Sequence, residues 1–354
     1  MPIPSHKLPP SSRTSYFISQ LEGEQLTIPG SKGVFRILAS AAQTAGKISV
    51  FQSGAVLSDA PGFHYHEQAH DVFLVTKGFL KLWNGDKCRI MGPGDFAYVP
   101  PKIIHNPELL GPHTETFGLV APGDWVDFFR YVGEPFSGLL LPERDDRDIK
   151  GHIIPKMMAA PQHYDVHFLR DPNFQPPAVA AWEESEGATL PEEGKPYYLR
   201  ANAGPRWMAG GVMSRPFITT KQSGGRFAIT SLESSNTYGL SLFSSKYVAF
   251  PDVDHVFSVQ EGAIRISLQD DGNEWTTVRE GETAVIAAAQ AFKLDFVSKY
   301  ARVWLFTDGK GLDELVCACA GGENLGQVVL PDKATSVDEN TFKSACESVG
   351  ATLS

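Results

Sequence analysis

The sequence predicts an all-β protein made of two related β-barrels joined by a long linker. Two observations lead to this prediction: the chain is a series of short β-branched and aromatic runs, and a pattern from its first half recurs in its second half. Few stretches carry the 3.6-residue apolar period of a helix, and 33 glycines and 25 prolines are spread along the 354 residues. Strands at this spacing are typical of β-sandwiches and β-barrels.

Two segments have the strand–turn–strand pattern of a hairpin. Residues 79–83 (Phe-Leu-Lys-Leu-Trp) end at Asn-Gly-Asp in positions 84–86. Residues 263–268 (Ala-Ile-Arg-Ile-Ser-Leu) end at the polar run Gln-Asp-Asp-Gly-Asn in positions 269–273. Asn-Gly and Asp-Gly favour tight turns between antiparallel strands, so we expect a hairpin at each place.

The internal repeat links the two halves of the chain. Residues 71–78 (Asp-Val-Phe-Leu-Val-Thr-Lys-Gly) recur as residues 255–262 (His-Val-Phe-Ser-Val-Gln-Glu-Gly). A strand, a polar hairpin and a glycine-acid-aliphatic segment follow in each copy, at residues 94–99 and 281–286. The offset grows from 184 residues at the octet to 187 at the glycine, which indicates a longer hairpin in the second copy.

The repeat divides the chain into four parts. We expect an N-terminal barrel over residues 1–140, a second barrel over residues 206–330, and a tail over residues 331–354 that forms a short helix. Residues 141–205 between the barrels are rich in Pro, Glu and Asp. So long a connection in a compact protein is usually a packed linker, often one that covers the mouth of a barrel.

The charge balance argues against some classes of partner. A net charge of −10 and a pI near 5.5 disfavour nucleic acid and anionic membranes, which bind basic faces. The sequence has no run of about eighteen apolar residues that could span a bilayer. The N-terminal residues lack the apolar stretch of a secretory signal, so we expect a cytoplasmic protein, or a secreted one if the sequence is a processed form.

One constellation of residues points to metal chemistry. His64 and His66 are two apart on a predicted strand, so their side chains share a face and can close on one ion. Asp71 and Phe73 share the inward face of the next strand, and His105 follows a Gly-x5-Pro-x4-His segment on a later one. Three neutral imidazoles and a carboxylate suit Cu, Fe, Ni, Co, Mn or Zn, so one transition-metal ion per chain is predicted.

These segments resemble the paired motifs of the cupin superfamily. The run from His64 to residues 125–129 (Trp-Val-Asp-Phe-Phe) resembles the N-terminal cupin of fungal quercetin 2,3-dioxygenases, which are bicupins of similar length with a long linker. The resemblance implies two jelly-roll β-barrels and one ion, usually copper, held by three histidines and a glutamate. Carried over by position, the ligands are His64, His66, His105 and Asp71, and Phe73 is the aromatic wall residue.

The chain departs from that family at three points. Asp71 replaces the glutamate and is shorter by one methylene, so it contacts the metal directly or acts through water. Pro107 stands where the family has a substrate-facing phenylalanine, and a secretory signal is not seen. These departures predict a related catalyst with a different substrate.

The second copy of the repeat lacks the ligands. At the positions equivalent to His64, His66, Asp71 and His105 stand three apolar residues and one histidine: Val248, Phe250, His255 and Phe292. We therefore expect a second barrel that binds no metal and has a structural role.

Several side chains have a plain structural interpretation beside a functional one. His70 and Glu67 are rival ligands, but His70 has the opposite strand parity to Asp71. His163 and His167 are four apart, as in a helical metal site, yet lack a further partner. Substrate contact and core packing are both open for Trp125, Phe128 and Phe129. Cys317 and Cys319 lie on a predicted strand, and we expect them to be buried.

Three functions remain open. The first is a metal-dependent dioxygenase that cleaves carbon–carbon bonds of an aromatic enol, flavonol-like or polyketide-derived as in fungal secondary metabolism, with O2. Asp71 would be its general base, while Phe73, Trp125 and Phe128 would contact the substrate. The second is a metal-assisted isomerase, lyase or cyclase, and the third a non-catalytic bicupin that binds a small ligand. The base rate of oligomers favours a homodimer.

Overall fold

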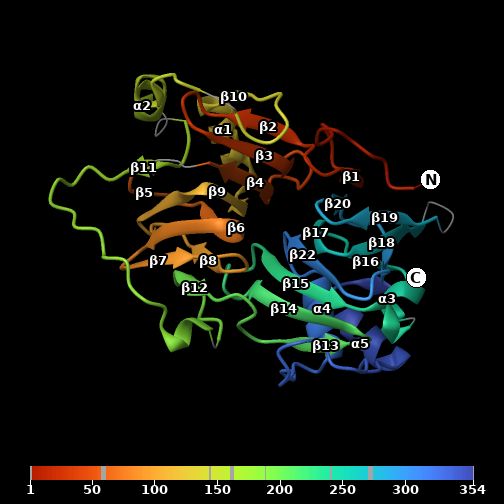
Figure 1. Cartoon of the computed structure of the whole chain (residues 1–354). Coiled ribbons are helices and arrows are strands. Elements are labelled where there is room, and N and C mark those ends of the chain that lie inside the picture. The colour runs from red at the N-terminus through yellow and green to blue at the C-terminus, as the bar shows by residue number, and fades with distance from the viewer. Residues whose placement is uncertain are drawn as a thin grey trace. The chain divides into compact units, whose positions relative to one another are not determined.

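The computed structural model describes residues 2–56, 61–142, 145–159, 163–187, 189–239, 241–269 and 274–353 (Figure 1). The chain forms two compact units, each with its own sheets. The N-terminal unit comprises Leu21–Ala41 and Ala45–Ala203, and the C-terminal unit comprises Met1–Gln20, Ala42–Thr44 and Gly204–Ser354. The chain is mainly β-structure, as the sequence predicts, but its units follow other boundaries than the four parts expected.

The strands described in the N-terminal unit form one sheet, in the order β10-β2-β3-β4-β9-β6-β8-β12, with β5 beside β9, β11 beside β5 and β7 beside β6. Their bounds are β2 Glu24–Thr27, β3 Gly33–Ala39, β4 Ser49–Ala55, β5 His64–Tyr65, β6 His70–Asn84, β7 Lys87–Met91, β8 Phe96–Val99, β9 His105–Ala121, β10 Glu134–Pro135, β11 His167–Phe168 and β12 Tyr197–Leu199. The helical segments are η1 Gly123–Val126, α1 Asp127–Val132, α2 Ile149–Ala159 and η3 Glu184–Gly187.

Two long strands, β6 and β9, form the frame of this sheet. The first part of β6 pairs with β8, its last part pairs with β7, and β9 pairs along both parts. The bend between these parts lies at Gly78, where φ is 68° and an added Cβ would lie 2.2 Å from the carbonyl oxygen of His113. Only glycine fits this irregularity, beyond which β6 continues to pair with β9 in a shifted register.

The linker is part of the N-terminal unit. Its strand β11 pairs with β5, and β12 pairs with β8. Between them, the Trp83 indole N–H donates to the carbonyl of Pro177 (3.0 Å), and Val179 bridges to Cys88. The residues expected to be a separate linker therefore extend this sheet, and β11 lies beside β5 (Figure 1).

The strands described in the C-terminal unit form two sheets, in the orders β1-β20-β17-β22-β15-β14-β13 and β19-β18-β21-β16-β23. Their bounds are β1 Tyr16–Ile18, β13 Trp207–Ala209, β14 Val212–Ile218, β15 Ala228–Ser234, β16 Val248–Ala249, β17 His255–Glu261, β18 Ala263–Leu268, β19 Thr276–Arg279, β20 Thr283–Ile286, β21 Phe292–Phe296, β22 Ala301–Thr307 and β23 Thr352–Leu353. The helical segments are η4 Asn236–Tyr238, α3 Leu242–Ser245, α4 Leu312–Cys319 and α5 Glu339–Val349.

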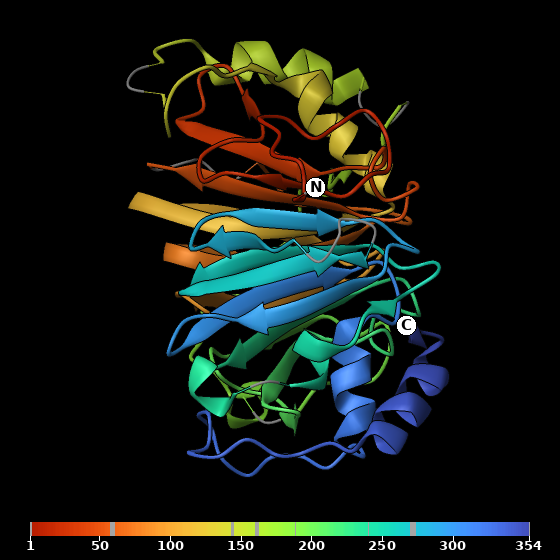
Figure 2. The same cartoon turned by 90° about the vertical axis from the view of Figure 1, so that its right-hand side faces the viewer.

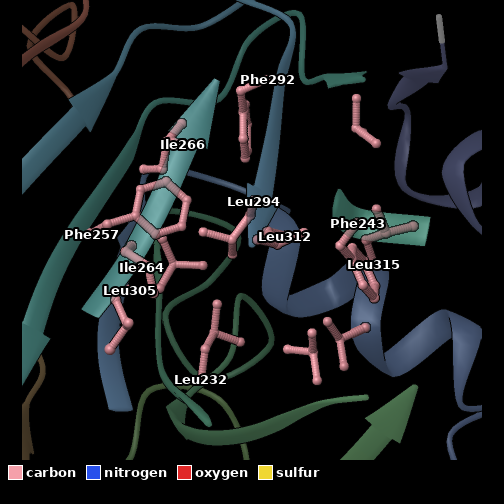
Figure 3. Packing of buried hydrophobic residues seen from close by; sticks show 14 of the residues in the cluster. Leu232, Phe243, Phe257, Ile264, Ile266, Phe292, Leu294, Leu305, Leu312 and Leu315 are labelled. Carbon is pink, nitrogen blue, oxygen red and sulfur yellow. The ribbon is translucent and has the colours of Figure 1, made fainter. Parts of the chain in front are cut away.

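An apolar core fills the C-terminal unit. Phe257, Ile264 and Ile266 face Phe292 and Leu294, and side chains of α4 close the cluster (Figure 3). Helices α4 and α5, the blue helices of Figure 2, pack on one another.

The two helices at the end of the chain differ in how well the sequence predicted them. The expected terminal helix is α5, whose N-cap Asp338 accepts two backbone N–H groups. Cys317 and Cys319 were expected on a strand, and this was wrong: they lie on α4. Its buried residues Leu312, Leu315, Val316 and Cys319 are spaced three and four apart, which is the period of a helix. The cysteines described are all free thiols.

The strand register repeats between the units. Asp71 of β6 pairs with Val99 and Val120, and the equivalent His255 of β17 pairs with Ile286 and Thr307. The offset is 184 residues before the hairpin and 187 after it, as the sequence predicted. Nine residues separate Ile266 from its partner Thr276, where six separate Leu82 from Arg89. The turn residues 270–273 themselves lie outside the described residues.

The edge strands of the two units are exchanged along the chain. Strand β12, which comes just before the second half, pairs with β8 of the N-terminal unit. Strand β1, at the start of the chain, pairs with β20, which is the counterpart of β8 in the C-terminal unit. The start of the chain thus belongs to the C-terminal unit, although the repeat in the sequence suggests the opposite.

Among the residues described, no helix is both long enough and apolar enough to cross a membrane.

Candidate metal centre

Three strands of the N-terminal unit bring four predicted ligands together. His64 on β5 pairs directly with His105 on β9, and His66 follows two residues after His64. Asp71 enters from β6, which pairs with the other end of β9. One ligand atom from each of His64, His66, Asp71 and His105 lies within 4.8 Å of the other three. Strand pairing therefore brings together residues that are up to 41 positions apart in the sequence.

The three imidazoles are oriented so that one nitrogen of each is free to bind an ion. Nδ1 of His64 bonds to the carbonyl of Gly62 (2.7 Å), and Nδ1 of His105 bonds to the carbonyl of Ile103 (2.9 Å). Nδ1 of His66 bonds to the carbonyl of Asp165. Because a carbonyl only accepts, each Nδ1 carries a proton, so in the neutral form of each ring Nε2 holds the lone pair that an ion would bind.

Asp71 completes the cluster with a carboxylate. Its Oδ2 atom lies 3.2 Å from Nε2 of His66 and 3.1 Å from Nε2 of His105. Burial raises the pKa of this carboxyl, but the charges and hydrogen bonds of the two histidines hold it well below its usual range. The carboxylate is therefore ionised at neutral pH and attracts a cation into the space between the nitrogens.

Burial and the neighbouring charges also shift the pKa values of His64 and His66. Burial lowers the pKa of His64 well below its usual value, and the charges of His105 and His66 lower it further, so His64 is neutral at pH 7. Burial also lowers the pKa of His66, but the charge and hydrogen bond of Asp71 raise it more. A proton on His66 and a metal ion thus compete for the same lone pair, as is usual at imidazole sites.

The donor set fits a first-row transition ion. Three imidazole nitrogens and one carboxylate oxygen match Cu, Fe, Ni, Co, Mn and Zn better than Ca or Mg, which prefer oxygen ligands. All four residues are buried, with His105 fully so. Among the residues described, no other group of three or more His, Cys, Asp or Glu side chains comes this close together.

Asp165, a linker residue that the sequence did not single out, holds this centre in place. Its carboxylate accepts the backbone N–H groups of residues 67–69 at 2.7–2.9 Å, which fixes the turn between β5 and β6. Its carbonyl accepts from His66 and from the Trp125 indole (3.0 Å). Because it is 99 positions from His66 and acts through a carbonyl, no motif marks it.

Aromatic rings surround the cluster. The Trp125 ring centroid lies 5.0 Å from that of His66, and Phe73 lies 6.4 Å from His105. Phe168, on the linker strand β11, lies 5.7 Å from His64. Phe128 packs on Trp125 (5.3 Å) as a second layer. Of the three aromatic residues predicted at the site, Phe73 and Trp125 contact the cluster histidines, and Phe168 was missed.

The rival ligands lie outside the cluster. His70 stacks on Tyr98 and its Nδ1 lies 2.7 Å from the Tyr98 hydroxyl, so strand parity placed it correctly on the opposite face. Glu67 is exposed and pairs with Lys102 at 3.7 Å. His167 stacks on Tyr65, and its partner in the predicted spacing, His163, is exposed. Pro107, two residues after His105, pairs with Leu82 on β6.

The equivalent positions of the C-terminal unit carry no such cluster. Val248 pairs with Phe292, in the same register as His64 with His105. The rings of Phe250 and Phe292 pack against His255 at tilted and edge-on angles, with centroids 4.6 and 5.3 Å from it. His255, in the place of Asp71, accepts the backbone N–H of Leu312 at the start of α4.

Residues 52–115, which include the cluster, match the family model of the cupin domain. The N-terminal unit contains a cupin domain. A quercetin 2,3-dioxygenase of Aspergillus japonicus is 24% identical over 323 residues, which cover 84% of this chain and 90% of that relative. A quercetin 2,3-dioxygenase of Bacillus subtilis (strain 168) is 30% identical over 133 residues, 38% of this chain and 39% of that relative.

The likeness to a solved structure extends beyond the matched residues. The crystal structure of protein Ylba from E. coli superposes with a TM-score of 0.51 at 10% identity, over 84% of this chain and 90% of that one. This likeness supports the fold alone. Together with the internal register, it agrees with the predicted bicupin plan.

Proposed function

We propose that this cupin protein is a metal-dependent dioxygenase that cleaves carbon–carbon bonds of a flat, enolic aromatic substrate with O2. The observation that carries the proposal is the convergence of three Nε2 atoms and the Asp71 carboxylate in a buried, aromatic-walled centre. The similarity to two quercetin 2,3-dioxygenases supports the reaction class. Copper is the ion that the resemblance favours, and a flavonol-like compound is the first substrate to test.

The ion would be held by His64, His66 and His105, with Asp71 as the fourth ligand or beside it. Such an ion supplies a Lewis acid that makes an enolic hydroxyl more acidic and a centre at which O2 and the enolate meet. The three Nδ1–carbonyl bonds keep the imidazoles aimed at this point without reorganisation.

Asp71 would accept the proton of the substrate hydroxyl at Oδ2. A carboxylate whose pKa lies well below its usual range is a weak base, so this transfer needs a hydroxyl that has itself been made acidic.

The aromatic residues would orient the ring and exclude water. Phe73 and Phe168 lie near different histidines, on β6 and on the linker strand β11, and Trp125 packs on a third. Apolar walls around a few polar groups are the usual design of a small-molecule site. They also protect a reactive enolate from bulk water.

Oxygen uptake by the metal-loaded full chain tests the proposal. A panel of flavonols and other enolic aromatics should include a compound that consumes about one O2 per substrate, with ring-cleaved product seen by mass spectrometry. Turnover at the same rate without O2 would instead show an isomerase, lyase or cyclase. Tight binding of these compounds with no conversion, whichever ion is loaded, would show a binding protein.

A further inference from the structure

The repeat places two buried arginines at equivalent positions in the two units. Arg36 on β3 pairs with Gln52 on β4, and Arg215 on β14 pairs with Ser231 on β15. The next strand follows in the same register, with Phe117 opposite Gln52 and Trp304 opposite Ser231. The two side chains are only 8% and 3% exposed. A buried guanidinium is unfavourable unless its N–H groups find acceptors, so the partners of each arginine can be compared directly.

Arg215 has a carboxylate partner. Its Nε atom donates to Oε1 of Glu233 at 3.3 Å, and its Nη2 donates to the carbonyl of Val328 at 2.6 Å. Glu233 lies on β15 two residues after Ser231, so both side chains share one face of the strand. The hydroxyls of Ser231 and Tyr300 also donate to this carboxylate, at 3.2 and 3.1 Å.

Arg36 lacks this partner. Its Nη1 atom donates to Gln52 at 3.1 Å, but its Nε atom has no hydrogen-bond acceptor among the residues described. The position equivalent to Glu233 is Gly54, which has no side chain to offer. Burial lowers the pKa of Arg36, and the charge of Glu115 opposes this shift only in part.

A recess lies where the missing carboxylate would be. It is lined by Arg36, by residues of β4, β6 and β9, and by three apolar side chains. These are Gln52, Ser53, Gly54, Thr76, Glu115, Thr116, Val34, Leu140 and Leu141. Its volume of about 30 Å³ exceeds what one water molecule needs and suits only a few non-hydrogen atoms. None of the four metal-cluster residues lines it.

We propose that this recess binds a small carboxylate, of the size of formate or acetate, held by the guanidinium of Arg36, just as Arg215 at the equivalent position holds the carboxylate of Glu233. Arginine and carboxylate are matched in shape and charge, and the pair is strongest when buried. The ligand class follows from the repeat, because the other copy carries this carboxylate covalently. Aromatic compounds are too large, so this site is distinct from the proposed catalytic one.

Glu115 limits the affinity of the site. Its carboxylate lines the recess and repels an anion, although Lys77 at 4.0 Å partly neutralises it. A ligand of three or four non-hydrogen atoms binds with a dissociation constant on the order of millimolar at best. Replacing Glu115 by glutamine should therefore tighten binding, by roughly threefold to tenfold.

Binding of ¹³C-labelled acetate and formate to the full chain tests the proposal, measured by NMR line broadening at constant ionic strength with chloride as the reference anion. Arg36→Gln should weaken binding at least about tenfold. Gly54→Glu should abolish binding and raise the melting temperature, because it supplies the carboxylate from within. Gly54 is not in a left-handed conformation, and a Cβ there would meet its nearest neighbours at 3.4–3.7 Å, so the substitution fits the backbone.

Gly54→Gln is the matched control, since it fills the recess without the charge and should block binding with a smaller gain in melting temperature. Broadening that persists in both Gly54→Glu and Arg36→Gln would place the anion elsewhere and overturn the proposal. No broadening in the wild type and in Glu115→Gln would also overturn it and leave the recess to water. Metal content and oxygen uptake are separate measurements, so failure here does not affect the proposed function.

Discussion

The two units have the same strand register but differ in what they bury where that register brings four residues together. In the N-terminal unit these are three histidines and Asp71, with Nδ1 of each histidine bonded to a carbonyl. In the C-terminal unit, Val248, Phe250 and Phe292 are packed into the core, and His255 bonds to the start of α4. A polar cluster of the first kind is costly to bury, whereas the apolar one stabilises its unit.

This difference shows which part of the fold tolerates change. The backbone pairing between His64 and His105 is the same as that between Val248 and Phe292, so the register does not depend on the ligands. We infer that the polar residues are retained in the N-terminal unit for what they bind. The following substitutions test this comparison in pairs, one residue from each unit.

The largest effect is expected for His66→Ala. Loss of one of three imidazoles should reduce bound metal from about one ion per chain to near none, and oxygen uptake to background. Elemental analysis of the purified chain measures this directly. The matched variant Phe250→Ala should keep the ion and instead lower the free energy of unfolding by about 3–5 kcal/mol. Equal metal content in wild type and His66→Ala would place the ion at another site.

Asp71→Asn separates proton transfer from metal binding. The three histidines remain, so the ion should stay, but kcat should fall by roughly 10²–10⁴-fold because the amide cannot accept the proton. Steady-state oxygen uptake beside metal analysis gives both quantities. His255→Asn, at the equivalent position, should leave kcat unchanged. Wild-type turnover in Asp71→Asn would remove this residue from the mechanism.

Asp165→Ala tests whether the linker holds the metal centre in place. The turn at residues 67–69 would lose three hydrogen bonds, which loosens the backbone between His66 and Asp71, while the carbonyl of residue 165 would remain to accept from His66. Metal affinity should fall by roughly 10–100-fold, as for other residues that orient a ligand. Competition with a chromophoric chelator measures the change. Asp171→Ala, in the same linker but bonded only locally to Asn173, is the control, and an equal loss there would argue against a specific role.

The smallest effect is a pH dependence in the C-terminal unit. Burial lowers the pKa of His255 to about 4, below its unfolded value of 6.5. The unfolded chain therefore binds more protons in this range, and the stability that His255 contributes is full above pH 6.5 and lost as the pH falls toward 4. Between pH 7.5 and pH 5 this loss is roughly 2 kcal/mol. Urea unfolding at both pH values should show a smaller loss in His255→Gln, and an identical loss would contradict the assignment.

The sequence predicted the metal cluster because strand periodicity is local. His64 and His66 share a face at a spacing of two, and the same parity argument correctly set His70 apart from Asp71. The repeat supplied the rest, because each copy keeps its glycine at the bend: Gly78 and Gly262 both have φ near 70° and lie against a carbonyl oxygen. Patterns with a physical period or a steric requirement can be recognised in one sequence.

What the sequence did not predict depends on contacts between distant segments. Asp165 and Phe168 reach the cluster only because β11 pairs with β5, and no local sequence pattern indicates that pairing. The cysteines at 317 and 319 were assigned to a strand from alternation over three residues, which is too short to distinguish a strand from a helix. The unit boundaries were missed because β1 and β12 are short edge strands without a recognisable pattern.

Because the edge strands β1 and β12 are exchanged, the two halves of the chain cannot fold as separate modules. A fragment that starts at residue 206 would lack residues 16–18 and leave the edge of Thr283–Ile286 without its partner. Bare edges of this kind recruit foreign strands and lead to aggregation. A synthetic peptide of residues 1–20 added in trans would supply the missing strand, as in donor-strand complementation. The two units therefore cannot be separated by simply cutting the chain between its two halves.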